Sequence, residues 1–297
     1  MTSPVYDMMV RKKMLKIQER LGMRIGISGG TSKTPVVKNT QKLLEVLEEL
    51  YRIGLRAFVI PRDYFSDIDS STDLYKTKYG DLIKVKEIAA KYGIELSIAY
   101  PDLPEKNDEI LRTFCTIGTV MDARTFMVQP TFFPRMPPEQ AIRLIVHKLN
   151  DVTNTMRLKF KIGIETTGKM SQVGTVEDVL EIVDRTSGTE PILNWAHIHG
   201  RGSGAMRSQA DFKRIIEKAR AVGGGGWTDS AYMMFSGVKY GPSGEVGHIP
   251  LDKSDINLEF LIREVMGANL RGTLIFEDPD KEKWIVKNME KLADMVR

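Results

Sequence analysis

The stretch that decides the fold spans residues 161–194 and reads KIGIETTGKMSQVGTVEDVLEIVDRTSGTEPILN. It begins with a β-rich run, Lys161–Glu165, and ends with a second one, Pro191–Asn194. Between these runs, apolar residues recur at the three- and four-residue spacing of a helix with one buried face. They are Val176, Val179, Leu180 and Val183. A strand, an amphipathic helix and a second strand predict parallel strands joined by a right-handed crossover.

The same alternation runs through the whole chain. Helical stretches follow β-rich runs at Arg24–Ile27, Ala57–Ile60, Glu95–Ala99, Phe126–Gln129, Lys161–Glu165, Pro191–Asn194, Ala231–Phe235 and Gly272–Phe276. Eight such units in 297 residues predict an α/β protein with a closed (β/α)8 TIM barrel rather than an open doubly wound sheet. The first run is not followed by a GxGxxG turn, which argues against a dinucleotide-binding fold.

Residues 1–22 precede the first strand and predict an N-terminal helical extension. Its apolar residues are Met8, Met9, Leu15 and Leu21, which stand among basic residues. This extra helix would close the bottom of the barrel, pack on a partner or be solvated. Residues 23–297 then form a single barrel domain. The four glycines Gly223–Gly226 predict a flexible loop that enters the seventh strand.

Composition excludes several classes of protein. Hydrophobic residues at 42% and charged residues at 28% rule out a disordered or fibrous chain. No apolar run approaches the ~20 residues that a membrane span needs, and Arg11, Lys12 and Lys13 interrupt the only mildly apolar N-terminal stretch. We therefore expect a cytoplasmic protein that does not contact a membrane. The single cysteine, Cys115, excludes an internal disulfide and a cysteine-cluster metal site, and suits a reducing compartment.

Two glutamates stand where a barrel of this kind places its chemistry. Active sites of TIM barrels lie at the C-terminal ends of the strands, and Glu165 and Glu277 follow the apolar fifth and eighth runs. A lone glutamate at such a point is more often a salt bridge or a helix cap. Two of them at equivalent strand ends favour a functional site.

The segment Asn194–Arg201, which reads NWAHIHGR, is the most informative short stretch. His197 and His199 are two residues apart, so in an extended stretch they would share a face with Arg201. Paired imidazoles beside a carboxylate can hold one metal ion. The alternative is a polar junction that hydrogen-bonds neighbouring backbone. His248 lies in a later loop and could join them, whereas His147 lies off the apolar stripe of its helix and is expected in solvent.

Several segments together resemble endonuclease IV, in its archaeal branch. They are residues 164–175 (IETTGKMSQVGT), 194–201, 235–240 (FSGVKY), 244–245 with 248–251 (HIPL) and 277–279 (EDP). The resemblance runs in the same order from about residue 24 to the C-terminus. It implies a barrel of the xylose-isomerase-like type that binds three zinc ions and cleaves the DNA backbone on the 5′ side of abasic sites.

Carried over residue by residue, the resemblance implies an incomplete zinc site. It gives Glu165, His197, His248 and Glu277 as metal ligands, with Glu165, His197 and Glu277 as catalytic residues. Four further ligand positions hold other residues here, namely Ala99, Gln129, Asn194 and Met234. Alanine and methionine offer zinc little, and neutral amides are weaker ligands than histidine or aspartate. We therefore expect one zinc ion or none rather than three.

Related sugar isomerases hold a single metal with glutamate, aspartate, histidine and glutamate on strands five to eight. This chain replaces the middle two by Asn194 and Met234, so that set is incomplete as well.

Three functions remain open after this comparison. The first is an endonuclease IV-like DNA-repair hydrolase, acting on phosphodiesters at abasic sites, with weak or no cleavage. The second is a metal-poor barrel that binds nucleic acid or another phosphate-bearing ligand. The third is a small-molecule enzyme of the sugar isomerase or epimerase type that uses Glu165, His197, His199 and Glu277 for proton transfer. Candidate phosphate-binding residues are Lys169, His199, Arg201 and Tyr240.

Overall fold

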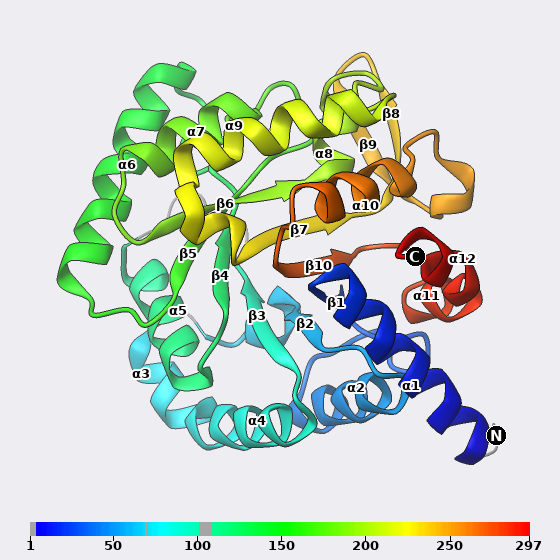
Figure 1. The fold of residues 1–297 in the computed structure, drawn as a ribbon. Coiled ribbons are helices and arrows are strands. Elements are labelled where there is room, and N and C mark those ends of the chain that lie inside the picture. The colour runs from blue at the N-terminus through cyan, green and yellow to red at the C-terminus, as the bar shows by residue number, and fades with distance from the viewer. Residues whose placement is uncertain (1–3, 69, 101–107) are drawn as a thin grey trace.

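The computed structural model describes residues 4–68, 70–100 and 108–297. Its centre is a closed barrel of parallel strands in the order β1-β10-β7-β6-β5-β4-β3-β2 (Figure 1). The strands are β1 Met23–Ser28, β2 Ala57–Ile60, β3 Glu95–Ala99, β4 Thr125–Val128, β5 Lys161–Glu165, β6 Thr189–Asn194, β7 Ala231–Phe235 and β10 Gly272–Phe276. The predicted TIM barrel is confirmed, and the predicted strands differ from these by two residues at most.

Helices surround the barrel on the outside (Figure 1). The longer ones are α2 Thr40–Ile53, α4 Tyr79–Tyr92, α5 Asp108–Met121, α6 Pro138–Thr155, α7 Val176–Asp184, α9 Gln209–Thr228 and α10 Leu258–Gly267. Short elements are η1 Arg62–Phe65, α3 Ser71–Asp73, η2 Leu74–Lys78, α8 Trp195–Arg201, η3 Leu251–Lys253, α11 Glu282–Lys287 and α12 Met289–Met295. Gly54 and Gly93 end α2 and α4 with φ of 85° and 67°, the left-handed conformation that glycine adopts without strain. Among the described residues, no helix has both the length and the apolar character that crossing a membrane demands.

An N-terminal helix, α1 Pro4–Leu21, precedes the barrel and lies beside α2 (Figure 1). It is fixed by the buried side chain of Gln18, whose Nε2 donates to the carbonyl of Gly54 at 2.8 Å and whose Oε1 accepts from the amide of Ile25 at 2.8 Å. The face that packs on the barrel carries Met14 and Ile17. Met8 and Met9, by contrast, are 66% and 65% exposed.

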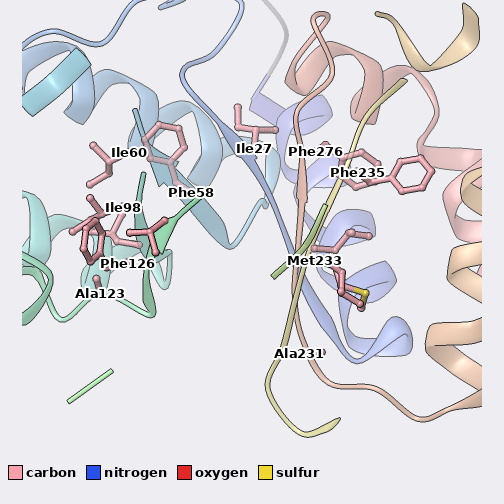
Figure 2. Close-up of a cluster of buried hydrophobic side chains, with 14 of the residues drawn as sticks. Ile27, Phe58, Ile60, Ile98, Ala123, Phe126, Ala231, Met233, Phe235 and Phe276 are labelled. Atoms are coloured by element: carbon pink, nitrogen blue, oxygen red, sulfur yellow. The ribbon is translucent and has the colours of Figure 1, made fainter. Parts of the chain in front are cut away.

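Alternation along each strand divides the apolar residues into two clusters. Side chains that point outward pack under the helices, as Figure 2 shows for Phe58, Ile98, Phe126, Met233 and Phe276. Side chains that point inward fill the barrel and are Ala57, Val59, Met127, Ile192, Tyr232, Met234 and Ile275. The inner cluster closes the barrel below the level at which β6 and β7 end. Polar groups at the strand ends therefore stand over an apolar floor.

The four glycines Gly223–Gly226 do not form the loop that the sequence predicted. They lie inside α9, which is interrupted at Gly224, where φ is 61° and ψ is −160°. The helix resumes because Trp227, in its last turn, is buried and its Nε1 donates to the carbonyl of Pro191 at 3.3 Å. Tertiary packing of that indole thus overrides the low helix propensity of glycine.

A two-stranded hairpin outside the barrel, which the sequence did not predict, lies between β7 and α10. Its antiparallel strands are β8 Gly237–Gly241 and β9 Gly244–Ile249. It rests on the loop that follows β5, because the amide of Glu245 donates to the carbonyl of Gly168 at 2.9 Å and the amide of Met170 donates to the carbonyl of Ser243 at 3.1 Å. The hairpin also packs on α8. It brings a new set of side chains to the mouth of the barrel.

Candidate functional site

A cavity of about 350 Å³ opens at the C-terminal ends of the strands. One part of its wall is apolar and includes Val59, Ala99, Met127, Phe132 and Met234. The other part carries polar and charged residues, among them Ser28, Arg62, Gln129, Glu165, His197, Glu245, His248 and Glu277. Seven loops and strand ends that are distant in sequence contribute these groups, so the closed barrel is what brings them together.

Asn194 is a buried polar residue that links two glutamates of this cavity. It ends β6, is 0% exposed, and its amide Nδ2 donates to Glu165 Oε1 at 2.8 Å and to Glu277 Oε2 at 2.9 Å. Its Oδ1 accepts from the backbone amide of His197 at 3.3 Å and thereby caps α8. The orientation of the amide group follows from these contacts, since the reverse orientation would set an oxygen against two carboxylates.

The two glutamates have their remaining oxygens occupied as well. Gln129 Nε2 donates to Glu165 Oε2 at 3.3 Å, and Ser28 Oγ donates to Glu277 Oε1 at 3.1 Å. Burial raises the pKa of Glu165 above its ordinary value of 4.5, and the neighbouring charge of Glu277 adds to the rise although His197 opposes it. A carboxyl group in this setting retains its proton to a higher pH than a solvated glutamate does.

His197 points into the cavity from α8. Its Nδ1 lies 2.7 Å from the carbonyl oxygen of Thr166, which can only accept, so Nδ1 carries the hydrogen. In the neutral ring the lone pair is then on Nε2, which lies 3.4 Å from Asn194 Nδ2 and 3.4 Å from Glu245 Oε2. Burial lowers the pKa of His197, but the carboxylates of Glu165, Glu245 and Glu277 outweigh it and the net direction is upward.

His248 completes a cluster that we call the hairpin triad: His197, Glu245 and His248. Its Nε2 is buried, lies 3.6 Å from Glu245 Oε1 and has no hydrogen-bond partner among the residues that the structure describes. The three possible ligand atoms lie within 4.8 Å of one another. Two imidazole nitrogens and one carboxylate oxygen are a common donor set for zinc and similar divalent ions.

Sequence reasoning missed Glu245. The metal ligands predicted from the sequence include His248 but no carboxylate from the segment around it. The β8–β9 hairpin turns Glu245 inward, and Val246, next to it along the strand, is 67% exposed. Strict alternation along β9 would place Glu245 and His248 on opposite faces, but the register shifts where Lys239 pairs with Gly247 and Tyr240 pairs with Glu245, so that both side chains reach the cavity.

His199 does not share a face with His197, so the expectation of an extended stretch is wrong. Asn194 ends the strand and starts α8 at Trp195, and residues two apart on a helix point about 200° apart. His199 is fully buried; its Nδ1 accepts from the amide of Met206 at 3.1 Å and its Nε2 donates to Asp255 Oδ1 at 2.9 Å. Tyr240 donates to the other oxygen of Asp255 at 2.7 Å.

Arg201 is held by the loop that follows β5. Its guanidinium donates to Thr167 Oγ1 at 3.0 Å and to the carbonyls of Lys169 at 2.6 Å and Gln172 at 2.8 Å. Lys169 itself is exposed on that loop. The four residues expected to bind phosphate are therefore not gathered at the cavity, because three of them already bind other parts of the protein. Of the substituted ligand positions, Ala99, Gln129 and Met234 line the cavity, and Asn194 is buried and bonds two of the cavity's glutamates.

Comparison with known proteins gives one family and several similar structures. The family described as xylose isomerase-like TIM barrel matches residues 47–295. An uncharacterised protein of Methanocaldococcus jannaschii is 24% identical over 256 residues, which are 84% of this chain and 91% of that protein. Solved structures similar in fold include SacUVDE, with a TM-score of 0.64 and 16% sequence identity, where the match covers 92% of this chain and 99% of the other. A D-tagatose 3-epimerase-like protein has a TM-score of 0.64 and 17% identity, with coverage of 92% and 97%. The IOLI protein with a binding zinc atom has a TM-score of 0.61 and 16% identity, with coverage of 92% and 95%.

Proposed function

The chain belongs to the xylose isomerase-like TIM barrel family, and from that premise we propose that it is a small-molecule enzyme that transfers protons on a polyhydroxy carbonyl compound. This is the sugar isomerase or epimerase type of reaction. The observation that carries the proposal is the pair Glu165 and Glu277, both bonded to the amide of Asn194 in one cavity. Among the similar structures, one is titled a D-tagatose 3-epimerase-like protein.

A carboxylate pair suits proton transfer for a simple chemical reason. Moving a hydrogen next to a carbonyl group requires a base that removes a proton and an acid that returns one. Glu165 comes from β5 and Glu277 follows β10, so they face the cavity from different sides of the barrel. Burial raises the pKa of Glu165, which brings that carboxyl group closer to the range in which acid–base catalysis works near neutral pH.

Size and charge support a small, uncharged ligand rather than a phosphate polymer. A cavity of about 350 Å³ lies at the lower end of the range of small-molecule sites. Its walls carry the acidic side chains of Glu165, Glu245 and Glu277 against one guanidinium, that of Arg62, and this acidic excess disfavours a phosphate group. The guanidinium of Arg201, the strongest phosphate-binding candidate in the sequence, is held by backbone carbonyls.

The hairpin triad fits one divalent cation. Two imidazole nitrogens and one carboxylate oxygen are suitable ligands, and the buried Nε2 of His248 is unpartnered among the described residues. His197 donates the hydrogen on its Nδ1 to a backbone carbonyl, as metal-binding histidines commonly do. A cation bound there would supply Lewis-acid polarisation of a substrate oxygen. The residues of the chain itself would orient the ligand and move its protons.

The same triad supports a second candidate function, phosphodiester hydrolysis at abasic sites in DNA with a reduced metal site. The resemblance to endonuclease IV favours this alternative. Against it, Ala99, Gln129 and Met234 line the cavity without an imidazole or a carboxylate. We therefore expect cleavage of abasic DNA to be weak or absent.

Exchange of hydrogen for deuterium tests the primary proposal. The protein, with and without added Zn²⁺ or Mn²⁺, is incubated in D₂O with a set of free aldoses and ketoses and followed by NMR. We expect exchange next to a carbonyl, reduced about 10²-fold or more by Glu165→Gln or Glu277→Gln. Glu259→Gln, a surface glutamate paired with Arg263, is the matched control and should not change the rate. Absence of exchange together with efficient abasic-site cleavage that Glu245→Gln abolishes would favour the hydrolase instead.

A further inference from the structure

The cavity contains two places where anionic or imidazole ligands converge, and their hydrogen bonding differs. At the first, Glu165 and Glu277 meet the amide nitrogen of Asn194 at 2.8 and 2.9 Å. At the second, the hairpin triad has ligand atoms within 4.8 Å of one another. We propose that Asn194 closes the first place to divalent cations and thereby directs a cation to the hairpin triad. Cation uptake can be measured without any substrate, so this inference does not depend on the proposed reaction.

Every carboxylate oxygen at the first place accepts a hydrogen bond. All four oxygens of Glu165 and Glu277 accept one, from Asn194 twice, from Gln129 and from Ser28. Two carboxylates around one point are a typical beginning of a divalent-cation site. Here an amide group occupies that point, and both of its hydrogens are used. A cation would have to displace a donor that it cannot replace by a ligand, because the amide nitrogen has no available lone pair.

Asn194 cannot turn away to admit a cation. Its Oδ1 accepts from the amide of His197, and its backbone amide donates to Thr166 Oγ1 at 3.0 Å. The side chain is 0% exposed, and Met234, its neighbour on β7, is 2% exposed. Rotation of the side-chain amide would remove the cap of α8 and set its NH₂ group against the backbone amide of His197. The closed arrangement is therefore the one that the surrounding contacts hold.

The second place has the opposite character. His248 Nε2 has no hydrogen-bond partner among the described residues, whereas His197 Nε2 lies 3.4 Å from Asn194 Nδ2 and 3.4 Å from Glu245 Oε2. A buried ring nitrogen without a partner is costly, and a cation would satisfy it together with the neighbouring nitrogen of His197 and the carboxylate of Glu245. The contrast between the four bonded carboxylate oxygens of the first place and the unpartnered nitrogen of His248 is what selects the triad.

The substitution Asn194→Asp tests this selection directly. Aspartate keeps an oxygen to cap α8 but removes both donor hydrogens and adds a third carboxylate beside Glu165 and Glu277. Asn39→Asp is the matched control, because Asn39 also caps a helix through its side-chain oxygen, on α2, and is exposed. Asn194→Ser, which removes the amide and keeps a capping oxygen, serves as a second variant if Asn194→Asp does not fold.

Binding of Zn²⁺ and Co²⁺ to chelator-treated protein is measured by calorimetry and by the cobalt absorption spectrum, with circular dichroism as a check of folding. We expect one cation per chain in the unsubstituted protein, with affinity reduced at least about tenfold by Glu245→Gln or His248→Ala. Asn194→Asp should bind a further cation that persists in the double variant with His248→Ala, and Asn39→Asp should behave as the unsubstituted protein. The proposal is overturned if the unsubstituted protein takes up no cation, if its cation is lost with Glu165→Gln but not with His248→Ala, or if folded Asn194→Asp and Asn194→Ser gain no binding.

Discussion

The side-chain amide of Asn194 donates a hydrogen bond to Glu277 across the strand that separates them in the barrel. Asn194 ends β6 and Glu277 follows β10, while β7 lies between these two strands. The bond can form because Met234 of β7 points into the barrel below it and offers no polar group of its own.

Asn194→Ala should reduce the free energy of unfolding by about 3–5 kcal/mol. It removes two hydrogen bonds to buried carboxylates, each of which contributes about 1.5–3 kcal/mol when the acceptor is charged. Urea unfolding measures the change. Asn257→Ala is the control, since that exposed asparagine only caps α10 and its loss should cost about 1 kcal/mol. Equal losses in the two variants would contradict the central role of Asn194.

Gly168→Ala should weaken binding of a divalent cation about 10–100-fold. A Cβ atom at this position would lie 1.8 Å from Glu245 Oε2, so the carboxylate must leave its place beside His197. Gly247→Ala, on the same hairpin but with open space around it, should leave cation binding unchanged. Calorimetric titration with Zn²⁺ compares the two variants, and an unaltered affinity in Gly168→Ala would show that Glu245 is not a ligand.

Asp255→Asn should destabilise the protein at neutral pH and have a smaller effect in acid. Burial raises the pKa of Asp255, but hydrogen bonds from Tyr240 and His199 outweigh it and hold the pKa below the ordinary value of 3.8. Because the folded-state pKa is depressed, the stabilisation is present above pH 3.8 and is lost as the pH falls below it. The side chain is half exposed, so we expect only about 0.5–1 kcal/mol at pH 7.

Urea unfolding at pH 7 and pH 3 measures this difference between Asp255→Asn and the unsubstituted protein. Hydrogen exchange at residues 237–249 should increase in the same variant, because Asp255 joins the hairpin to α8 through Tyr240 and His199. A destabilisation that grows in acid would contradict the assignment.

Cys115 should resist thiol reagents until the protein unfolds. The residue is 0% exposed on α5, and burial raises the pKa of its thiol to about 12. The reactive thiolate is therefore scarce at pH 8, and the reagent cannot reach the sulfur. Labelling with a chromogenic disulfide should be slow in buffer and complete in urea. Rapid labelling of the folded protein would contradict the buried position.

The strands were predictable because each depends on a short local pattern. Lys161–Glu165 and Gly272–Phe276 have the bounds that the sequence predicted, since a buried parallel strand reads as a continuous apolar run. The placement of Glu165 and Glu277 in one cavity follows in turn, because a closed barrel gathers the C-terminal ends of its strands. His147 also lies as predicted, in solvent.

What the sequence could not determine depended on contacts between distant segments. Glu245 reaches His197 only because the hairpin docks on the loop after β5, and nothing in residues 237–249 specifies that docking partner. His199 points away from His197 because Asn194 caps a helix at this point. Two residues that are two positions apart share a face on a strand but point in different directions on a helix. The amino-acid order thus fixed which residues stand at the strand ends. Only tertiary packing decided which of their oxygens and nitrogens are already satisfied and which remain open to a ligand, because hydrogen-bond partners in this cavity come from strands and loops far apart in the chain.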